Sequence, residues 1–135
     1  MNFRTFGKTD WQLSEIGLGT MPLSGMYGPV DDHAAIKTIL YALGQGINFI
    51  DTALMYGNGR AHLQIAEALK QWNGDKIYVA TKAEPIRWPD PYDGNPTMRG
   101  RYPAWYLRAE VERSLKQLGV ERIDLFQLHC WIPQG

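Results

Sequence analysis

The sequence predicts an α/β fold in which short parallel strands alternate with helices. Strand-like apolar runs begin near residues 16, 48, 77 and 123. Between them lie segments whose apolar residues recur at the three- and four-residue spacing of a helix. Glycines follow these segments at positions 44, 74 and 119, as expected for helix ends. Strand–helix alternation of this kind favours parallel strands with helices packed outside them.

The N-terminal region is expected to precede the alternating units as a β-hairpin. Extended segments at 2–6 and 11–14 flank a tetrapeptide of turn-forming residues. Residues 1–15 are therefore predicted to form the hairpin, and the first short strand of the α/β array follows at 16–19. The length of the chain fits one domain spanning residues 1–135.

Two amphipathic helices are expected on either side of the second strand, which is predicted at 48–51. The first helix opens at Asp31 and Asp32, because carboxylates suit the positive end of the helix dipole. The second helix spans roughly 61–71. Its predicted inner side consists of Leu63, Ile65, Ala66 and Leu69.

The second half of the chain contains the third and fourth strands, predicted at 77–81 and 123–129. Pro103 is well placed in the first turn of the helix between them. Residues 83–102 make this connection about a helix-length longer than the others, and they are rich in proline and aromatic residues. Long connections in compact domains are usually functional or disordered. We expect a loop that packs at the face where the strands end.

Composition and charge argue against several classes of partner. Fourteen basic residues balance fourteen acidic ones, so no net field favours nucleic acid or an anionic membrane. The chain start lacks the apolar core of a signal peptide, and no apolar stretch reaches the roughly 18 residues of a membrane span. The single cysteine, Cys130, fits a reducing compartment and shares no metal-like spacing with His33 or His62. A cytoplasmic protein without a metal site is expected.

Four polar residues lie at, or just past, the ends of the predicted strands: Asp51, Tyr56, Lys82 and His129. In a parallel α/β array all strand carboxyl ends share one face, and active sites are built there. Adjacent strands are about 4.8 Å apart, so side chains of this length can touch. Taken singly, Lys82 also fits an ordinary surface lysine, Tyr56 a packing residue and His129 a strand-end histidine.

An acid, a phenol, an amine and an imidazole are the parts of a proton-transfer site. A tyrosine beside a lysine cation is a better acid than a free one, because the cation stabilises the phenolate. In such a site Asp51 would hold Lys82, and Tyr56 would donate a proton to a carbonyl oxygen. His129 would hydrogen-bond the same oxygen. This relay lacks a reductant, which in nicotinamide enzymes is the cofactor.

Longer stretches around these residues resemble a known family. They are Gly17-Leu18-Gly19-Thr20-Met21, Gly46-Ile47-Asn48-Phe49-Ile50-Asp51-Thr52-Ala53, Tyr56-Gly57-Asn58-Gly59, Ala80-Thr81-Lys82, Glu112-Arg113-Ser114-Leu115 and Arg122-Ile123-Asp124-Leu125-Phe126-Gln127-Leu128-His129. The chain resembles the N-terminal half of the aldo-keto reductase superfamily, closest to its bacterial and potassium-channel β-subunit-like branch. The match is collinear and covers essentially the whole chain.

The resemblance implies a fold, a reaction and a set of site residues. The fold is the N-terminal portion of a (β/α)8 TIM barrel, with a β-hairpin, about four parallel strands and three helices. The reaction is NADPH-dependent reduction of an aldehyde or ketone, with a small carbonyl compound as substrate. The implied catalytic tetrad is Asp51, Tyr56, Lys82 and His129, and the implied nicotinamide-lining residues are Gly19, Thr20, Met21 and Asp51. The family usually has Ser-Glu where this chain has Ala61-His62.

The implied barrel is incomplete, because a closed one has eight β/α units. Four units leave two parallel sheet edges unpaired and the inner face uncovered, which invites pairing with another chain. We therefore expect a truncated chain that self-associates or meets a complementary C-terminal half chain. The alternative is a catalytically inactive half-barrel, either a fragment or an assembly and binding module. The resemblance leaves the activity of the 135-residue chain alone open.

Overall fold

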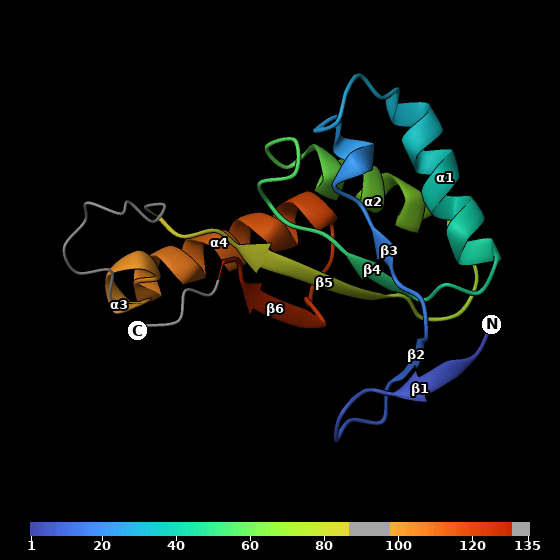
Figure 1. The fold of residues 1–135 in the computed structure, drawn as a ribbon, viewed down its shortest axis with the longest axis horizontal. Helices are drawn as coiled ribbons and strands as arrows, with labels where there is room; N and C mark the ends of the chain where they lie inside the picture. The colour runs from blue at the N-terminus through green and yellow to red at the C-terminus, as the bar shows by residue number, and fades with distance from the viewer. Residues whose placement is uncertain (87–97, 131–135) are drawn as a thin grey trace.

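The computed structural model describes residues 1–86 and 98–130, which form a small hairpin and a parallel sheet covered by helices (Figure 1). The strands are β1 (Phe3–Thr5), β2 (Gln12–Ser14), β3 (Leu18–Gly19), β4 (Phe49–Asp51), β5 (Tyr78–Ala83) and β6 (Leu125–Leu128). The helices are the 3-10 turn η1 (Pro22–Ser24), α1 (Asp32–Gly44), α2 (Arg60–Gln71), α3 (Met98–Arg101) and α4 (Ala104–Leu118).

The sheet has the order β3-β4-β5-β6 within the described ranges, and all neighbouring strands are parallel. Each strand therefore lies beside the next one along the chain, with a helical connection between them. The predicted α/β alternation is confirmed. β3 and β6 form the two edges, and neither has an outer neighbour in the described part of the chain.

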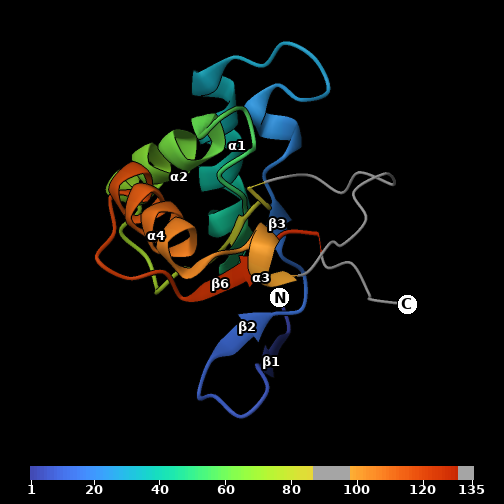
Figure 2. The ribbon, with the colours of Figure 1, turned by 90° about the vertical axis from the view of Figure 1, so that its left-hand side faces the viewer.

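The helices α1, α2 and α4 lie on one side of the sheet, as the turned view shows (Figure 2). Side chains from both layers meet in one apolar cluster, which includes Ile39, Ile50, Ile65, Val79 and Leu118. Fully burying each such side chain stabilises the fold by about 1.5–3 kcal/mol. Because strand side chains alternate between faces, burial of Ile50 and Val79 under the helices directs their strand neighbours to the opposite face.

The inner face of α2 differs from the prediction at one position. Ile65 and Ala66 are buried as predicted, but Leu63 is 58% exposed. The buried stripe instead includes Ala61, which lies one turn before Ile65. Leu63 is two residues from each of them, and residues two apart do not share a helix face.

The region after β5 also departs from the predicted boundaries. β5 continues to Ala83, so Lys82 lies inside the strand and not past its end. The short helix α3 occupies the end of the predicted loop 83–102. Residues 87–97 of that loop lie outside the described residues.

The N-terminal hairpin, β1 paired antiparallel with β2, is attached to the start of β4. The Asn48 side chain accepts a hydrogen bond from the Ser14 backbone N–H (2.8 Å) and donates one to the Gln12 carbonyl (2.8 Å). Trp11 also packs on Tyr78, with ring centroids 5.0 Å apart. The hairpin thus covers the amino end of the sheet and leaves the carboxyl end, where the predicted site lies, free of it.

Candidate active site

The centre of the candidate site is an ion pair between neighbouring strands. Lys82 Nζ donates to both carboxylate oxygens of Asp51, at 2.8 and 2.9 Å, and to the Thr52 carbonyl at 2.9 Å. The parallel register aligns Asp51 with Ala80, so Lys82, two residues further along, projects from the same face. An ammonium group has three donors, and all three are used here. Lys82 is therefore held as a fixed cation.

Tyr56 lies in the turn between β4 and α2, with its side chain buried. Lys82 Nζ is 5.3 Å from the centroid of the Tyr56 ring. The turn requires glycine at the next position, because Gly57 has φ +61° and a Cβ there would lie 2.8 Å from the Ser24 carbonyl oxygen. This close approach of two backbone segments fixes the position of the Tyr56 backbone, from which the side chain extends.

His129 directly follows β6 and completes the group. Its ring meets the Tyr56 ring edge-on, with centroids 6.0 Å apart and planes at 81°. Its backbone N–H donates to the Ala83 carbonyl at 2.7 Å, and its own carbonyl accepts a hydrogen bond from the Tyr102 hydroxyl. The ring atom Nδ1 is buried and has no hydrogen-bond partner among the described residues.

The surroundings of His129 favour a neutral imidazole. Burial lowers the pKa of His129, and the nearby Lys82 cation lowers it further, while Asp51 acts in the opposite direction. A neutral ring keeps one N–H donor and one acceptor nitrogen. His129 can therefore donate a hydrogen bond near neutral pH without carrying a charge.

The structure brings all four predicted residues together at the carboxyl end of the sheet, from β4, the β4–α2 turn, β5 and the end of β6. Their contacts run in a chain: Asp51 holds Lys82, Lys82 lies over Tyr56, and Tyr56 meets His129. We call Asp51, Tyr56, Lys82 and His129 the quartet. Their geometry suits proton donation to an oxygen, and their catalytic roles stay a prediction.

The predicted cofactor-lining residues lie beside the quartet but differ in exposure. Gly19 is exposed, is aligned with Asp51 in the sheet, and has open space where a Cβ would be. Thr20 has no exposed surface, and its N–H and hydroxyl both donate to the Asp51 carbonyl, at 3.1 and 3.3 Å. Met21 packs on the cluster that contains Tyr56. The backbone of Gly19, which has no side chain, leaves room for a flat ligand group beside Asp51. The Thr20 hydroxyl is already bonded to the Asp51 carbonyl, so Thr20 helps to hold Asp51 in place and does not offer a free donor.

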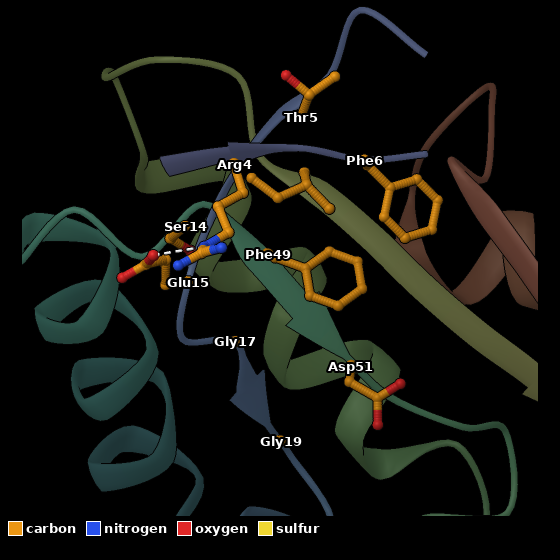
Figure 3. Close-up of a pocket in the computed structure, with 10 residues that line it drawn as sticks. Arg4, Thr5, Phe6, Ser14, Glu15, Gly17, Gly19, Phe49 and Asp51 are labelled. Carbon is orange, nitrogen blue, oxygen red and sulfur yellow. Dashed lines mark hydrogen bonds and ion pairs between the residues drawn. The ribbon is translucent and has the colours of Figure 1, made fainter. Parts of the chain in front are cut away.

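A cavity of about 540 Å³ opens between the hairpin and the uncovered face of the sheet (Figure 3). Phe49 and Gly19 line its sheet side, and Asp51 lies at its end nearest the quartet. On the hairpin side Arg4 and Glu15 pair at 2.5 Å, so their charges neutralise one another. The cavity thus extends the open space beside the quartet along the sheet.

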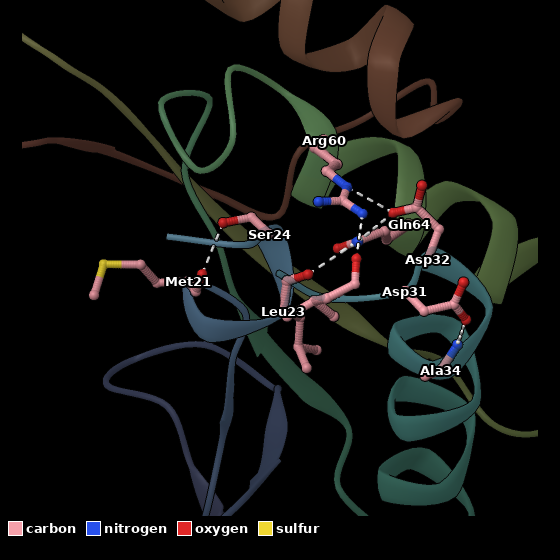
Figure 4. Close-up of polar contacts among 9 residues, drawn as sticks. Met21, Leu23, Ser24, Asp31, Asp32, Ala34, Arg60 and Gln64 are labelled. Atoms are coloured by element: carbon pink, nitrogen blue, oxygen red, sulfur yellow. Dashed lines mark hydrogen bonds and ion pairs between the residues drawn. The ribbon is translucent and has the colours of Figure 1, made fainter. Parts of the chain in front are cut away.

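A polar network missed by the sequence reasoning fixes the loop between β3 and α1 (Figure 4). Asp32 accepts hydrogen bonds from Arg60 Nε and Gln64 Nε2, both at 2.7 Å. Arg60 also donates to the Val30 carbonyl (2.5 Å) and Gln64 to the Leu23 carbonyl (2.9 Å). The bonds from Arg60 and Gln64 lower the pKa of Asp32. The only sign of this network in the sequence was Asp32. Its place at the start of a helix was already accounted for by the helix dipole, so no side-chain partner was predicted for it.

His62, where the chain departs from the family pattern, is a fully buried histidine beneath β5. Its Nδ1 lies 3.3 Å from Gln117 Oε1, and its Nε2 lies 2.9 Å from the Thr81 hydroxyl. An amide oxygen can only accept, so Nδ1 carries the proton and Nε2 accepts from Thr81. Thr81 directly precedes Lys82, so His62 supports the strand that presents it.

Two other kinds of feature are absent from residues 1–86 and 98–130. No group of three or more His, Cys, Asp or Glu side chains is placed to hold a metal ion. No helix in these ranges has the length and apolar character needed to cross a membrane.

Comparison with known proteins identifies relatives over nearly the whole chain. The family model described as the Aldo/keto reductase family matches residues 15–135. The chain is 37% identical over 131 residues to the aldo-keto reductase YhdN of Bacillus subtilis. This match covers 96% of this chain and 38% of that protein. It is also 34% identical over 131 residues to the NADH-specific methylglyoxal reductase of Escherichia coli. That match covers 91% of this chain and 40% of the relative.

Solved structures agree with these relatives. The holo form of aldo-keto reductase AKR11C1 from Bacillus halodurans is similar at a TM-score of 0.73 with 32% identity, over 96% of this chain and 40% of that one. The chain thus spans about two-fifths of the length of the relatives it matches.

Proposed function

Because the chain belongs to the aldo/keto reductase family, with residues 15–135 matched, we propose that it contributes to NADPH-dependent reduction of an aldehyde or ketone. The family also explains the open sheet, which is the N-terminal part of a (β/α)8 barrel. The observation that supports the proposal most is the Lys82 ammonium, held by Asp51 and 5.3 Å from the Tyr56 ring centroid.

Tyr56 is the proposed proton donor. As a carbonyl is reduced, negative charge develops on its oxygen, and a neighbouring phenol can supply the proton that the alcohol needs. Lys82 stabilises the phenolate that Tyr56 becomes. Asp51 keeps the ammonium in place, so the cation need not reorganise during the reaction.

His129 is the proposed second donor to the same oxygen. A neutral imidazole N–H next to the Tyr56 ring can orient a carbonyl group and stabilise the charge that develops on it. The half-buried position of His129 supports this role, because a hydrogen bond is stronger where the ring is partly removed from water.

The nicotinamide cofactor, when bound, supplies the hydride that reduces the carbonyl carbon. Gly19, Met21 and Asp51 are the proposed contacts at its nicotinamide end, and Thr20 supports them from below through its bonds to the Asp51 carbonyl. NADPH is the proposed cofactor and a small carbonyl compound the proposed substrate. One relative is named for NADH and methylglyoxal, so both nicotinamides and this aldehyde belong in the first assay.

The remaining strands of the barrel are proposed to come from further polypeptide, from a complementary C-terminal half chain or from a second copy. A catalytic cavity in this fold is enclosed by eight strand ends, and the described residues supply those of β3 to β6. Full activity therefore depends on what pairs with the edge strands.

The test is a titration of the purified chain with NADPH and NADH, followed by nicotinamide fluorescence, and an assay of cofactor oxidation with methylglyoxal. Binding with aldehyde-dependent oxidation is the expected result, measured against a blank without aldehyde. Absence of both binding and oxidation at high protein concentration contradicts the proposal for this chain.

A further inference from the structure

The backbone bends sharply directly after β6, at the last member of the quartet. Cys130 has φ +65°, a left-handed conformation that costs a non-glycine residue about 1 kcal/mol or more. The bend follows the last backbone bond between β6 and β5, which the His129 N–H donates to the Ala83 carbonyl. The His129 carbonyl then accepts a hydrogen bond from the Tyr102 hydroxyl.

Tyr102 is suited to hold this bend. Its side chain is 6% exposed, and it lies between α3 and α4, directly before Pro103. A residue before proline is restricted to extended conformations, and Pro103 itself is the extended cap of α4. The tyrosine is thus presented by a rigid helix start, 27 residues away from His129 in the chain.

The hydroxyl of Tyr102 stays a donor over the working range of pH. Burial raises the pKa of Tyr102, and negative charge on the neighbouring Cys130 sulfur would raise it further. The phenol therefore keeps its proton at neutral pH and donates it to the carbonyl.

With this bond, residue 129 is fixed on both sides of its Cα. Its N–H is bound to the Ala83 carbonyl at 2.7 Å, and its carbonyl is bound to Tyr102. With both peptide groups fixed, the direction of the Cα–Cβ bond is fixed as well. The imidazole then meets Tyr56 edge-on with no hydrogen bond to its Nδ1 from the described residues. The two backbone bonds thus fix where the side chain leaves the main chain, and the edge-on contact with Tyr56 holds the ring that follows.

We propose that Tyr102 is a positioning residue for His129, which acts through the backbone carbonyl to aim the imidazole at the oxygen beside Tyr56. The inference rests on the proposed function and deepens it, because it assigns a cause to the orientation of the second donor. The assigned role of Tyr102 runs through its bond to the His129 carbonyl alone.

The test uses the chain labelled with ¹⁵N at its three histidines, compared as wild type, Tyr102→Phe and Tyr106→Phe. In Tyr102→Phe we expect altered His129 ring shifts and a His129 titration midpoint that moves up toward the ordinary 6.5, because a freed ring leaves its half-buried place near Lys82. Tyr106→Phe is the matched control, because Tyr106 is a half-buried tyrosine and the third residue of α4, three positions after Pro103. Unmoved His129 signals in Tyr102→Phe, or equal shifts in Tyr106→Phe, overturn the proposal.

Two further readouts keep the result decisive. The His62 signals report whether the core is intact, because His62 is fully buried. It is also far in sequence from His129, whose carbonyl loses its hydrogen bond in Tyr102→Phe. If Tyr102→Phe disturbs them, the wild-type chain decides: its His129 carbonyl carbon must show a deuterium isotope shift from the Tyr102 hydroxyl, and the absence of that shift overturns the proposal.

The outcomes separate this inference from the proposed function. The NMR readouts need no cofactor and no turnover, so a failed Tyr102 test leaves carbonyl reduction untouched. A wild-type chain without cofactor binding or turnover contradicts the reduction and leaves the NMR result standing. Where turnover is measurable, Tyr102→Phe lowers kcat by roughly tenfold with little change in KM for the cofactor, less than the loss of about 100-fold from removing a donor outright.

Discussion

Lys82 is the residue on which the candidate site depends most. Its three protons are shared between one carboxylate and one backbone carbonyl, and its side chain is 14% exposed while that of Asp51 is 41% exposed. The half-exposed Asp51 can return to water when its partner is lost. The pair therefore matters for the charge near Tyr56 far more than for the stability of the fold.

Lys82→Met separates these two effects. Without the cation no positive charge is left beside the Tyr56 ring to stabilise the proposed proton transfer, and we expect turnover to fall by about 100-fold or more. The free energy of unfolding should change by no more than about 1 kcal/mol, because the remaining carboxylate is partly solvated. Urea denaturation and cofactor oxidation measure the two. Lys70→Met, which removes an exposed lysine paired with Glu67, should leave both unchanged; an equal loss of turnover there would argue against a specific role for Lys82.

His62 predicts how stability depends on pH. Burial lowers the pKa of His62 to about 4, which its bond with Gln117 opposes and Arg113 reinforces. In the unfolded chain the same group titrates at about 6.5, so between these values the unfolded state binds more protons. The free energy of unfolding should therefore fall as the pH drops below about 6.5, by roughly 3 kcal/mol once the pH is below 4.

Urea denaturation at a series of pH values, on wild type and His62→Gln, measures this contribution. His129 also has a lowered pKa, so the wild-type curve alone does not isolate His62. Glutamine keeps a donor and an acceptor but does not titrate, so its curve should be flatter over this window. Identical pH dependence in the two proteins would show that His62 does not contribute.

At the scale of elements, Asn48 links the hairpin to the sheet. Its side chain bonds Ser14 and Gln12, and its backbone N–H donates to the Ser14 hydroxyl at 3.1 Å. Asn48→Ala removes the two side-chain bonds and leaves the part-buried Ser14 N–H unpaired, while the exposed Gln12 carbonyl can bond water, so we expect a loss of about 1 kcal/mol. Faster hydrogen exchange confined to β1 and β2 should accompany it. Asn73→Ala, at an exposed position, is the control, and unchanged exchange in Asn48→Ala would contradict this role.

The elements themselves were largely predictable, because their signals are local. The α1 stripe and the Gly119 helix end follow from spacing and from a left-handed glycine (φ +65°). The α2 inner face was less predictable, since a leucine at position 63 suggests burial by its type and only the contacts of Ala61 and Ile65 show otherwise. A local sequence pattern does not show which neighbouring elements a helix packs against, and this packing decides which of its apolar residues are buried.

The four residues of the quartet could be predicted from the sequence, but the hydrogen bonds that hold the quartet and the neighbouring loop in place could not. The quartet follows from residue type at strand ends, together with the parallel order of the strands. The bonds from Arg60 and Gln64 to Asp32, and from Tyr102 to His129, join residues 27 or more apart in the chain. Such pairs depend on how whole elements pack, and no spacing in the sequence encodes them.

At the scale of the whole molecule, the open sheet predicts association. β3 and β6 present unpaired backbone groups in the described part of the chain, and parallel edges of this kind pair readily with other strands. The purified chain should form dimers or larger species at high micromolar concentration, as measured by light scattering. A clean monomer under these conditions would contradict this expectation.

A charge on the edge strand tests whether β6 is responsible. Leu128 lies on β6 with 38% exposure, and lysine on an edge strand opposes pairing. Leu128→Lys should therefore reduce association. Tyr41→Lys, which replaces an exposed side chain on α1, should leave it unchanged; an equal reduction would indicate that general charge, and not the edge, governs association.

The identity of the proton donor is the central claim, and Tyr56→Phe tests it most directly. The variant keeps the ring that packs under Lys82 and against His129 but lacks the hydroxyl. The assay is NADPH binding and NADPH oxidation with methylglyoxal, on wild type and variant, in whichever assembly shows wild-type turnover. The proposed role predicts that turnover falls by about 100-fold or more while NADPH affinity stays the same. Retained turnover, or an equal loss of turnover and affinity, would contradict it.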